Sequence, residues 1–318
     1  MVMEDFQMIP KMPPREGQLG FLYLPPYRVQ GVSVAGEQTV IQIPELDVVF
    51  DIGQCTRACL SSGVVALSHA HMDHLGGLPY WLSQRHFQKL GIGRIVCHPD
   101  LADPLERMIR SWVDLEQQNT PFEIKPLPPG EDLPLKSNLV LRSHETRHTA
   151  PSLAYTIVER RSKLKPEFTD LPQDKIRELK NSGTEITNVV EIPTIAVTGD
   201  TEACPALESP EFKKARIVLT ECTFFSAEHK ERAKIGRHIH VDDIEKLLDV
   251  WEAEHVVITH ISRRTSLGFA RDRINEIAEG RHAGRVHFLM DHRSNRRRYE
   301  LQAQEAQSGH GETSRSGC

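Results

Sequence analysis

The sequence predicts an α/β fold in which helices cover the outer faces of β-sheets. Short β-rich runs fill much of the first 50 residues, and strands then alternate with helices twice along the chain. That order is typical of sheets with helices packed outside them. No stretch has the composition of a linker, so the 318 residues predict one compact domain over positions 1–301.

The first half is expected to begin as a meander of strands and to continue with helices between them. Valines at alternating positions, interrupted by Gly and Pro, indicate the meander. A short run that is entirely apolar, at 64–67, indicates a buried strand. The expected strands span 27–34, 39–43, 46–50, 64–67 and 94–97, and the expected helices span 78–90 and 101–118.

Strands and helices alternate again in the second half. Residues 241–252 form an amphipathic pattern, with apolar side chains at i, i+3, i+4 and i+7. Residues 159–191 are charged and predict a surface insertion, whereas the polar stretch 302–318 predicts a disordered tail. The expected strands span 139–142, 153–158, 195–198, 217–220, 256–259 and 286–290, and the expected helices span 174–180, 241–252 and 269–278.

The composition is that of an ordinary globular protein with a mildly acidic balance. The 39 Lys and Arg against 44 Asp and Glu give a formal charge of −5, which does not suggest a nucleic-acid coat protein. No run reaches the roughly 18 apolar residues of a membrane span, so we expect no membrane partner. The start of the chain lacks a secretory pattern and the six cysteines are scattered, which predicts a cytoplasmic protein with reduced thiols.

The strongest chemical signal lies directly after the apolar run at 64–67. The segment His69-Ala-His-Met-Asp-His74 places four potential metal ligands within six residues. They cannot all reach one ion from a loop without strain, but they can serve two adjacent ions. Imidazole and carboxylate without thiolate suit zinc or another borderline divalent metal.

This motif after a hydrophobic strand resembles that of the metallo-β-lactamase superfamily. The resemblance covers about residues 20–290 and implies a four-layer αββα sandwich with metal ions at one edge of its sheets. The superfamily has a further His, Asp and His along the chain, and matching residues stand at His148, Asp200 and His260. Agreement at all seven positions makes the resemblance specific.

The resemblance also implies how the ligands are shared between two ions, expected to be Zn²⁺, with Mn²⁺ and Fe²⁺ as alternatives. Two such ions can lower the pKa of a water toward neutrality, so that hydroxide is available for hydrolysis at pH 7. Asp73 is expected to orient that hydroxide as well. The first ion would take His69, His71 and His148, the second would take Asp73, His74 and His260, and Asp200 would bridge them.

Two further segments resemble the ribonuclease Z branch, whose members are zinc phosphodiesterases that mature tRNA 3′ ends. They are His148-Thr-Ala-Pro-Ser-Leu-Ala-Tyr155, and Glu221-Cys-Thr-Phe followed by Gly236-Arg-His-Ile-His. By this resemblance His238 assists catalysis by donating to the leaving oxygen or by stabilising the transition state, with His240 as its rival. Glu221 either orients His238 or merely ends a strand at the surface.

The chain also departs from that branch. The insertion has no Gly-Pro tip of the kind found on the arm that grips tRNA, and its seven Lys and Arg are balanced by seven Asp and Glu. A strong grip on phosphates is therefore not indicated. Arg263 and Arg264 follow His260 and are candidate ligands for a substrate phosphate, or simply surface residues.

The predicted function is a dizinc phosphodiesterase that resembles ribonuclease Z and acts on RNA. The alternative is a hydrolase of the same fold that acts on a small ester, thioester, lactone or cyclic nucleotide; a non-catalytic RNA-binding protein is a third reading. The expected partner is RNA or a small phosphodiester. A homodimer is consistent with the resemblance.

Overall fold

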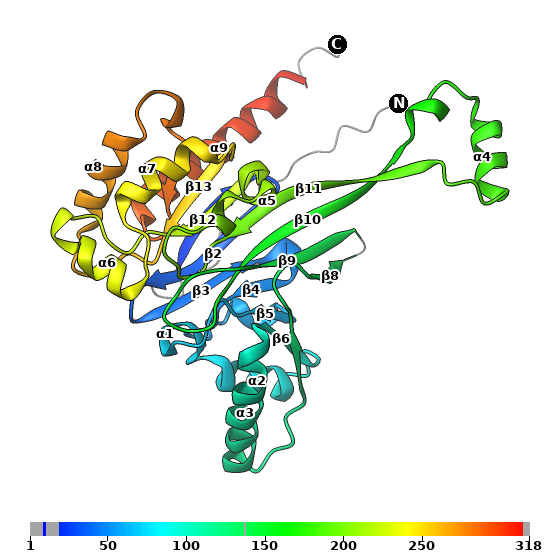
Figure 1. Cartoon of the computed structure of the whole chain (residues 1–318). Coiled ribbons are helices and arrows are strands. Elements are labelled where there is room, and N and C mark those ends of the chain that lie inside the picture. Colours follow the sequence, from blue (N-terminus) through cyan, green and yellow to red (C-terminus); the bar gives the residue numbers. More distant parts are fainter. Residues whose placement is uncertain (1–8, 11–18, 137, 314–318) are drawn as a thin grey trace.

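The computed structural model describes residues 9–10, 19–136 and 138–313, and within these ranges the strands form two seven-stranded sheets (Figure 1). Each sheet follows chain order, from β1 to β7 in the first and from β8 to β14 in the second. In both sheets the first four strands pair antiparallel and the last four pair parallel. The α/β fold with two sheets and flanking helices is thus as predicted.

The first sheet carries its helices between its parallel strands, because a parallel connection has to cross the sheet. Its strands are β1 (Gly20–Leu24), β2 (Tyr27–Val34), β3 (Gln38–Ile43), β4 (Val48–Phe50), β5 (Val64–Ala66), β6 (Gly93–Cys97) and β7 (Phe122–Pro126). Its helices are α1 (Met72–Leu75), α2 (Leu78–Phe87) and α3 (Ala102–Glu116), with short 3₁₀ turns at Pro44–Leu46, Cys59–Ser61 and Pro99–Leu101.

The second sheet repeats the arrangement. Its strands are β8 (Asp132–Lys136), β9 (Leu139–Glu145), β10 (Leu153–Leu164), β11 (Thr187–Val197), β12 (Ile217–Glu221), β13 (His255–Thr259) and β14 (Val286–Phe288). Its helices are α4 (Gln173–Asn181), α5 (Pro210–Lys214), α6 (Lys230–Gly236), α7 (Val241–Val250), α8 (Leu267–Ile277) and α9 (His292–Thr313), with 3₁₀ turns at Pro166–Phe168, Pro205–Glu208, Ala227–His229 and Gly280–His282.

Three apolar clusters hold these layers together. One lies between the two sheets and joins side chains such as Val48 and Tyr155. A second packs Trp81 and other side chains of α2 and α3 on the first sheet. The third packs α5, α7 and α8 on the second sheet through residues such as Phe212 and Leu248. Helices on both outer faces and an apolar layer between the sheets make this a four-layer sandwich.

Some elements differ from the sequence prediction. Strands β1, β7 and β8 were not expected; β7 and β8 contain charged residues and Pro126 or Pro134, which edge strands tolerate because one side of an edge strand has no partner. The disordered tail expected at 302–318 is wrong for 302–313, which continue α9. This helix packs along β1, where Tyr299 meets Phe21 edge to face. Residues 314–318 lie outside the described residues.

The insertion expected at 159–191 is a projecting hairpin, which we call the arm. Strands β10 and β11 pair from Tyr155–Val197 out to Leu164–Thr187, whereas β9 accompanies β10 only as far as Glu159. Beyond that point no other strand of the described ranges pairs with this ribbon, and Figure 1 shows it leaving the body with α4 at its tip. A register shift at Ile157/Val158 marks the β-bulge where the arm begins.

The fold also gathers the predicted ligands at one edge. The parallel strands β5, β11, β12 and β13 all end there, and His69, Asp200 and His260 follow three of them within a few residues. Ligands that lie far apart in the sequence are thereby brought together at the carboxyl ends of the strands. None of the helices in the described ranges has both the length and the apolar character to cross a membrane.

Candidate metal centre

The local structure around the histidine motif follows from its sequence. Buried strand β5 ends at Ala66, and five residues later His71 has extended backbone, with φ and ψ of −65° and 153°. The chain then turns into α1, which carries Asp73 and His74. Gly53 and Gly77 permit this turn, because a Cβ at either position would overlap backbone atoms of the neighbouring segment.

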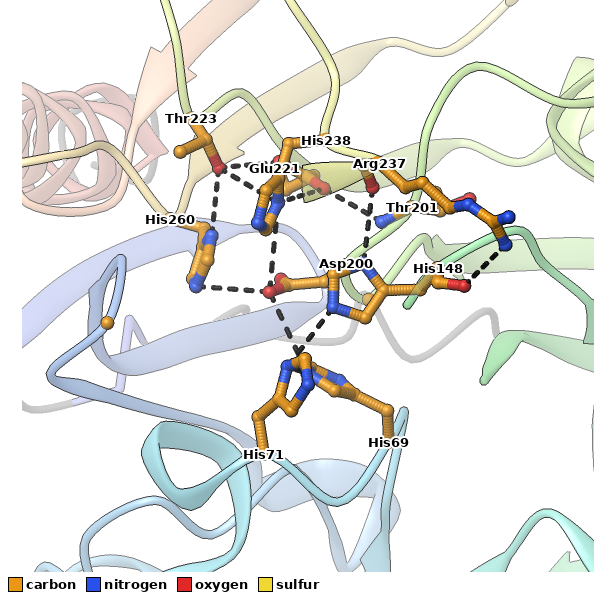
Figure 2. Close-up of polar contacts among 12 residues, drawn as sticks. His69, His71, His148, Asp200, Thr201, Glu221, Thr223, Arg237, His238 and His260 are labelled. Carbon is orange, nitrogen blue, oxygen red and sulfur yellow. Dashed lines mark hydrogen bonds and ion pairs between the residues drawn. The ribbon is translucent and has the colours of Figure 1, made fainter. Parts of the chain in front are cut away.

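Three imidazole nitrogens converge at the first predicted metal position. His71 Nδ1 lies 2.9 Å from His69 Nε2 and 3.2 Å from His148 Nε2. A tetrahedral zinc ion with bonds of about 2.05 Å holds its ligand atoms about 3.3 Å apart. Two of the three nitrogen–nitrogen distances are therefore close to the edges of such a site, and the third lies within 4.8 Å. Figure 2 shows His71 and His148 meeting in this way.

The second predicted position has the same character. His74 Nε2 and His260 Nε2 lie 3.2 Å apart, and Asp73 Oδ2 lies 3.7 Å from the first and 3.5 Å from the second. Asp200 Oδ2 stands between the two groups, at 3.2 Å from His74, 3.3 Å from His260 and 3.9 Å from His69. The structure thus brings all seven predicted ligands into contiguous groups of potential metal ligands.

Hydrogen bonds behind the cluster fix which nitrogen of His69, His74, His148 and His260 faces inward. Asp51 Oδ2 accepts from His74 Nδ1 at 2.7 Å, so in the neutral ring Nε2 carries the lone pair. Ser68 Oγ donates to the same carboxylate at 2.8 Å and lies 3.0 Å from His69 Nδ1. Since the hydroxyl hydrogen is already used, Ser68 must accept from His69, and His69 also presents Nε2.

The same logic holds on the other side of the centre. Thr223 Oγ1 donates to Glu221 at 2.6 Å, so it accepts from His260 Nδ1, 3.0 Å away (Figure 2). The main-chain oxygen of Arg237 accepts from His148 Nδ1 at 3.2 Å. Partners of this kind are what orient metal-binding histidines, because they leave the opposite nitrogen free to bind the ion. The donor set therefore fits a pair of divalent metal ions.

The charges in the centre also suit metal ions. Burial raises the pKa of the Asp200 carboxyl, but the surrounding imidazoles outweigh it and hold that pKa well below its usual value. Burial lowers the pKa of His69 and His148, which favours the neutral rings that metals require. Burial also lowers the pKa of His74, but Asp200 and Asp51 raise it well above normal, so a metal ion has to displace a proton there.

Beside the predicted ligands, the buried Glu221 pairs with the half-buried His238. His238 Nδ1 lies 3.0 Å and 3.2 Å from the two Glu221 oxygens and 3.9 Å from Asp200 Oδ2. Burial lowers the pKa of His238, but the charge and hydrogen bond of Glu221 raise it to about 9. Glu221 is buried, so it does not merely end a strand at the surface. Figure 2 shows His238 facing the cluster above Asp200.

The other candidates lie elsewhere. His240 begins α7 as its N-cap, accepts from the main-chain nitrogen of Asp242, and has its Nε2 3.0 Å from the main-chain oxygen of Ser226. Arg263 is paired with Glu37, with 2.6 Å between Nη2 and Oε2, and Arg264 is exposed. Among the described residues, neither guanidinium contacts the cluster.

Sequence reasoning missed the residues that hold the ligands. Asp51, Ser68 and Thr223 lie behind the rings of His74, His69 and His260, and Arg237 lies behind His148. Ser68 and Asp51 each end or follow a strand close to the motif, which is the only signal that pointed to them. No sequence signal pointed to Arg237, because its partner His148 lies 89 positions away.

Comparisons with known proteins agree with this geometry. A family model described as "Beta-lactamase superfamily domain" matches residues 49–261, or 213 of the 318 residues. The chloroplastic tRNase Z TRZ2 of Arabidopsis thaliana is 33% identical over 244 residues, which cover 75% of this chain and 68% of that protein. The tRNase Z TRZ1 of the same plant is 29% identical over 254 residues, which cover 79% and 91%.

Solved structures share the fold. The crystal structure of human tRNase Z, short form, superposes with a TM-score of 0.53 at 16% identity, covering 77% of this chain and 93% of that one. Zn²⁺-bound PqqB from Methylobacterium extorquens gives 0.55 at 11% identity, covering 85% and 96%. At these identities the match concerns the arrangement of sheets and helices.

Proposed function

We propose that this chain, which belongs to the metallo-β-lactamase superfamily, is a dizinc phosphodiesterase that cleaves RNA in the manner of ribonuclease Z. Membership follows from the family match over two thirds of the chain and from the plant tRNase Z relatives. The buried His and Asp groups are consistent with the metal site of such a hydrolase. The identity of the ions and of the substrate belongs to the proposal.

The observation that carries the proposal is the Glu221–His238 pair. Hydrolysis of an unreactive phosphodiester needs help for the leaving alkoxide, and His238 can supply it beside the predicted bridging ligand Asp200. Glu221 holds Nδ1, so the proton that moves to the leaving oxygen comes from Nε2. A buried carboxylate that keeps the ring cationic prepares this donor near neutral pH.

The other residues bind and orient. When bound, a pair of divalent ions supplies Lewis acidity and makes a water acidic enough to act as the nucleophile. Asp73 Oδ2 accepts a hydrogen bond from the main-chain nitrogen of Gly36 at 2.8 Å, which fixes the carboxylate close to His260. Asp73 can therefore orient a water or substrate group that lies between the two ligand groups.

The structure of the arm indicates how it would recognise a substrate. The arm lacks the Gly-Pro tip of ribonuclease Z and carries helix α4 at its tip instead. Several of its charges are paired within the arm or at its base, such as Arg161 with Glu159 and Lys175 with Glu178. We therefore expect the arm to recognise the shape of a folded RNA more than to attract phosphates.

The test is an activity screen with metal-stripped and zinc-reloaded protein. The substrates are a precursor tRNA with a 3′ extension, bis(p-nitrophenyl) phosphate as a generic phosphodiester, and a thioester. The proposal expects zinc-dependent cleavage of the precursor tRNA, and loss of that cleavage in Asp200→Ala. Turnover of the thioester without cleavage of RNA would replace it with the small-molecule alternative. Cytoplasmic location and a homodimer remain predictions.

A further inference from the structure

We propose that Arg237 is a positioning residue that locks the ligand His148 and, through it, couples one metal position to the catalytic His238. Arg237 holds His148 at two points. Its Nη1 donates to the main-chain oxygen of His148 at 2.8 Å, and its own main-chain oxygen accepts from His148 Nδ1 at 3.2 Å. Both contacts are visible in Figure 2. Arg237 therefore holds both the ring and the backbone of the predicted ligand His148.

The bonds within the loop that carries His148 do not hold its ring. His74 lies on helix α1, His260 directly follows β13, and His69 follows β5 after Leu67 and Ser68, with the main-chain nitrogen of Leu67 bonded to Val96 of β6. His148 instead lies in the loop between β9 and β10, in backbone that is neither helix nor strand. The loop closes on itself through Thr146 and Ser152, with 2.7 Å between their hydroxyl oxygens. The main chain of Arg147 is also bonded to Thr201 and Glu202, so the loop is held on both sides of His148 while the ring of His148 bonds to Arg237.

The backbone of Arg237 supports a positioning role. It follows helix α6 with φ of 51° and ψ of 57°, in the left-handed region where glycine is usually found after a helix. An arginine there is strained relative to glycine, so the backbone alone does not account for this side chain. Arg237 is exposed to solvent, so burial of its side chain does not account for it either.

Arg237 directly precedes His238, so its bonds to His148 also affect His238. The main-chain nitrogen of His238 donates to Ala233 at 2.8 Å and closes the end of α6, with Arg237 between the two. A shift of the His148 loop would therefore be transmitted to the histidine that stands 5.1 Å, ring to ring, from His148. This coupling rests on the proposed function of His238, whereas the hold on His148 does not.

The experiment compares zinc binding by Arg237→Ala, Arg237→Gly, Arg237→Lys and the control Arg232→Ala. Arg232 is an exposed arginine on the same helix, so its removal changes the net charge equally. Zinc content after dialysis against a competing chelator gives the affinity of each ion, and circular dichroism reports folding. The Ala and Gly variants lose the Nη1 bond to the His148 backbone but keep the main-chain oxygen that accepts from His148 Nδ1, so we expect the lower end of the roughly 10- to 100-fold loss of affinity that follows removal of partners behind a ligand. We expect this loss of zinc affinity for one of the two ions in Arg237→Ala and Arg237→Gly, a smaller loss in Arg237→Lys, and no loss in Arg232→Ala.

The glycine variant separates positioning from folding, because it relieves the left-handed strain while removing the side chain. Wild-type zinc affinity for both ions in a folded Arg237→Gly protein would overturn the inference, and so would an equal loss in Arg232→Ala. With both ions restored by excess zinc, kcat on the phosphodiester should still fall while KM stays, since His238 is displaced. Two tightly bound zinc ions without any RNA cleavage by the wild type would refute the proposed function and leave the hold on His148 standing.

Discussion

Removal of Arg142 tests how the arm is held. This guanidinium lies on β9 at the base of the arm and bonds three carboxylates from three other elements. Its Nε and Nη2 contact Asp132 at 2.8 and 3.0 Å, and Nη1 contacts Glu191 and Glu211 at 2.9 Å each. Arg160, the first arm residue beyond β9, joins the same network through Glu191. The predicted perturbation is Arg142→Met, which keeps an unbranched apolar stem and removes all the donors of the side chain.

The magnitude follows from burial. A hydrogen bond to a charged group contributes about 1.5–3 kcal/mol when sheltered, and exposed ion pairs contribute about 0–1 kcal/mol. Arg142 is 16% exposed, Asp132 19% and Glu191 36%, so the Asp132 contact should contribute most and the Glu191 contact least. We expect a loss of about 3 kcal/mol in the free energy of unfolding at pH 7, and a fall in Tm on the order of 4 °C for a chain of this size.

The effect should depend on pH in one direction. Hydrogen bonds from Arg142 lower the pKa of Asp132 and of Glu191. Burial raises the pKa of Glu211, but a main-chain hydrogen bond and Arg142 outweigh it. Carboxyls with lowered pKa stabilise the fold above their unfolded pKa, near 4, and that stabilisation is lost as pH falls through the lowered values. The difference between wild type and Arg142→Met should therefore be full at pH 7 and shrink toward pH 3.

The assay is urea unfolding at several pH values, with Arg177→Met on the exposed arm helix α4 as the control. Cleavage of a precursor tRNA and of bis(p-nitrophenyl) phosphate is measured in parallel. Because the network lies at the arm and not at the metal centre, KM for the RNA should rise while turnover of the small ester stays unchanged. A stability difference that is constant with pH, or an equal loss on both substrates, would refute this reasoning.

Two further predictions concern the centre itself. Asp51→Ala removes the acceptor of His74 Nδ1 and of the Ser68 hydroxyl, so zinc affinity should fall about 10- to 100-fold, as measured by chelator competition; unchanged affinity would contradict the role given to Asp51. His238→Ala should lower kcat on RNA about 10²- to 10⁴-fold, whereas His240→Ala should mainly cost about 1 kcal/mol of stability through loss of an N-cap. Both variants are compared by their kinetics and by thermal unfolding. The opposite result, in which His240→Ala loses activity and His238→Ala loses only stability, would exchange the roles of the two histidines.

The sequence predicted which residues gather at this edge because that information is local. His69 to His74 lie in one short segment, and each of the other candidate ligands follows a recognisable strand within a few residues. The fold class followed for the same reason, since apolar runs mark the buried strands. The edge strands β7 and β8 and the last turns of α9 escaped prediction, because they are partly polar and their partners come from distant segments.

What could not be predicted is the set of contacts between distant segments. Asp51 meets His74 across 23 positions and Arg237 meets His148 across 89. Neither pairing has a sequence pattern, because a side chain that supports a ligand can come from any strand end at the same edge. The choice between His238 and His240 was open for a similar reason. Glu221 and the start of α7 decide where each ring lies, and both are consequences of the fold.

The central claim is that the seven clustered residues hold two metal ions that cleave a phosphodiester in RNA. It is tested most directly by adding zinc to metal-stripped protein and following cleavage of a 3′-extended precursor tRNA against the number of zinc equivalents bound. The account predicts no cleavage without zinc, saturation at two equivalents per chain, and no recovery at any equivalent in Asp200→Ala. Full cleavage by the stripped protein, or by Asp200→Ala, would contradict it.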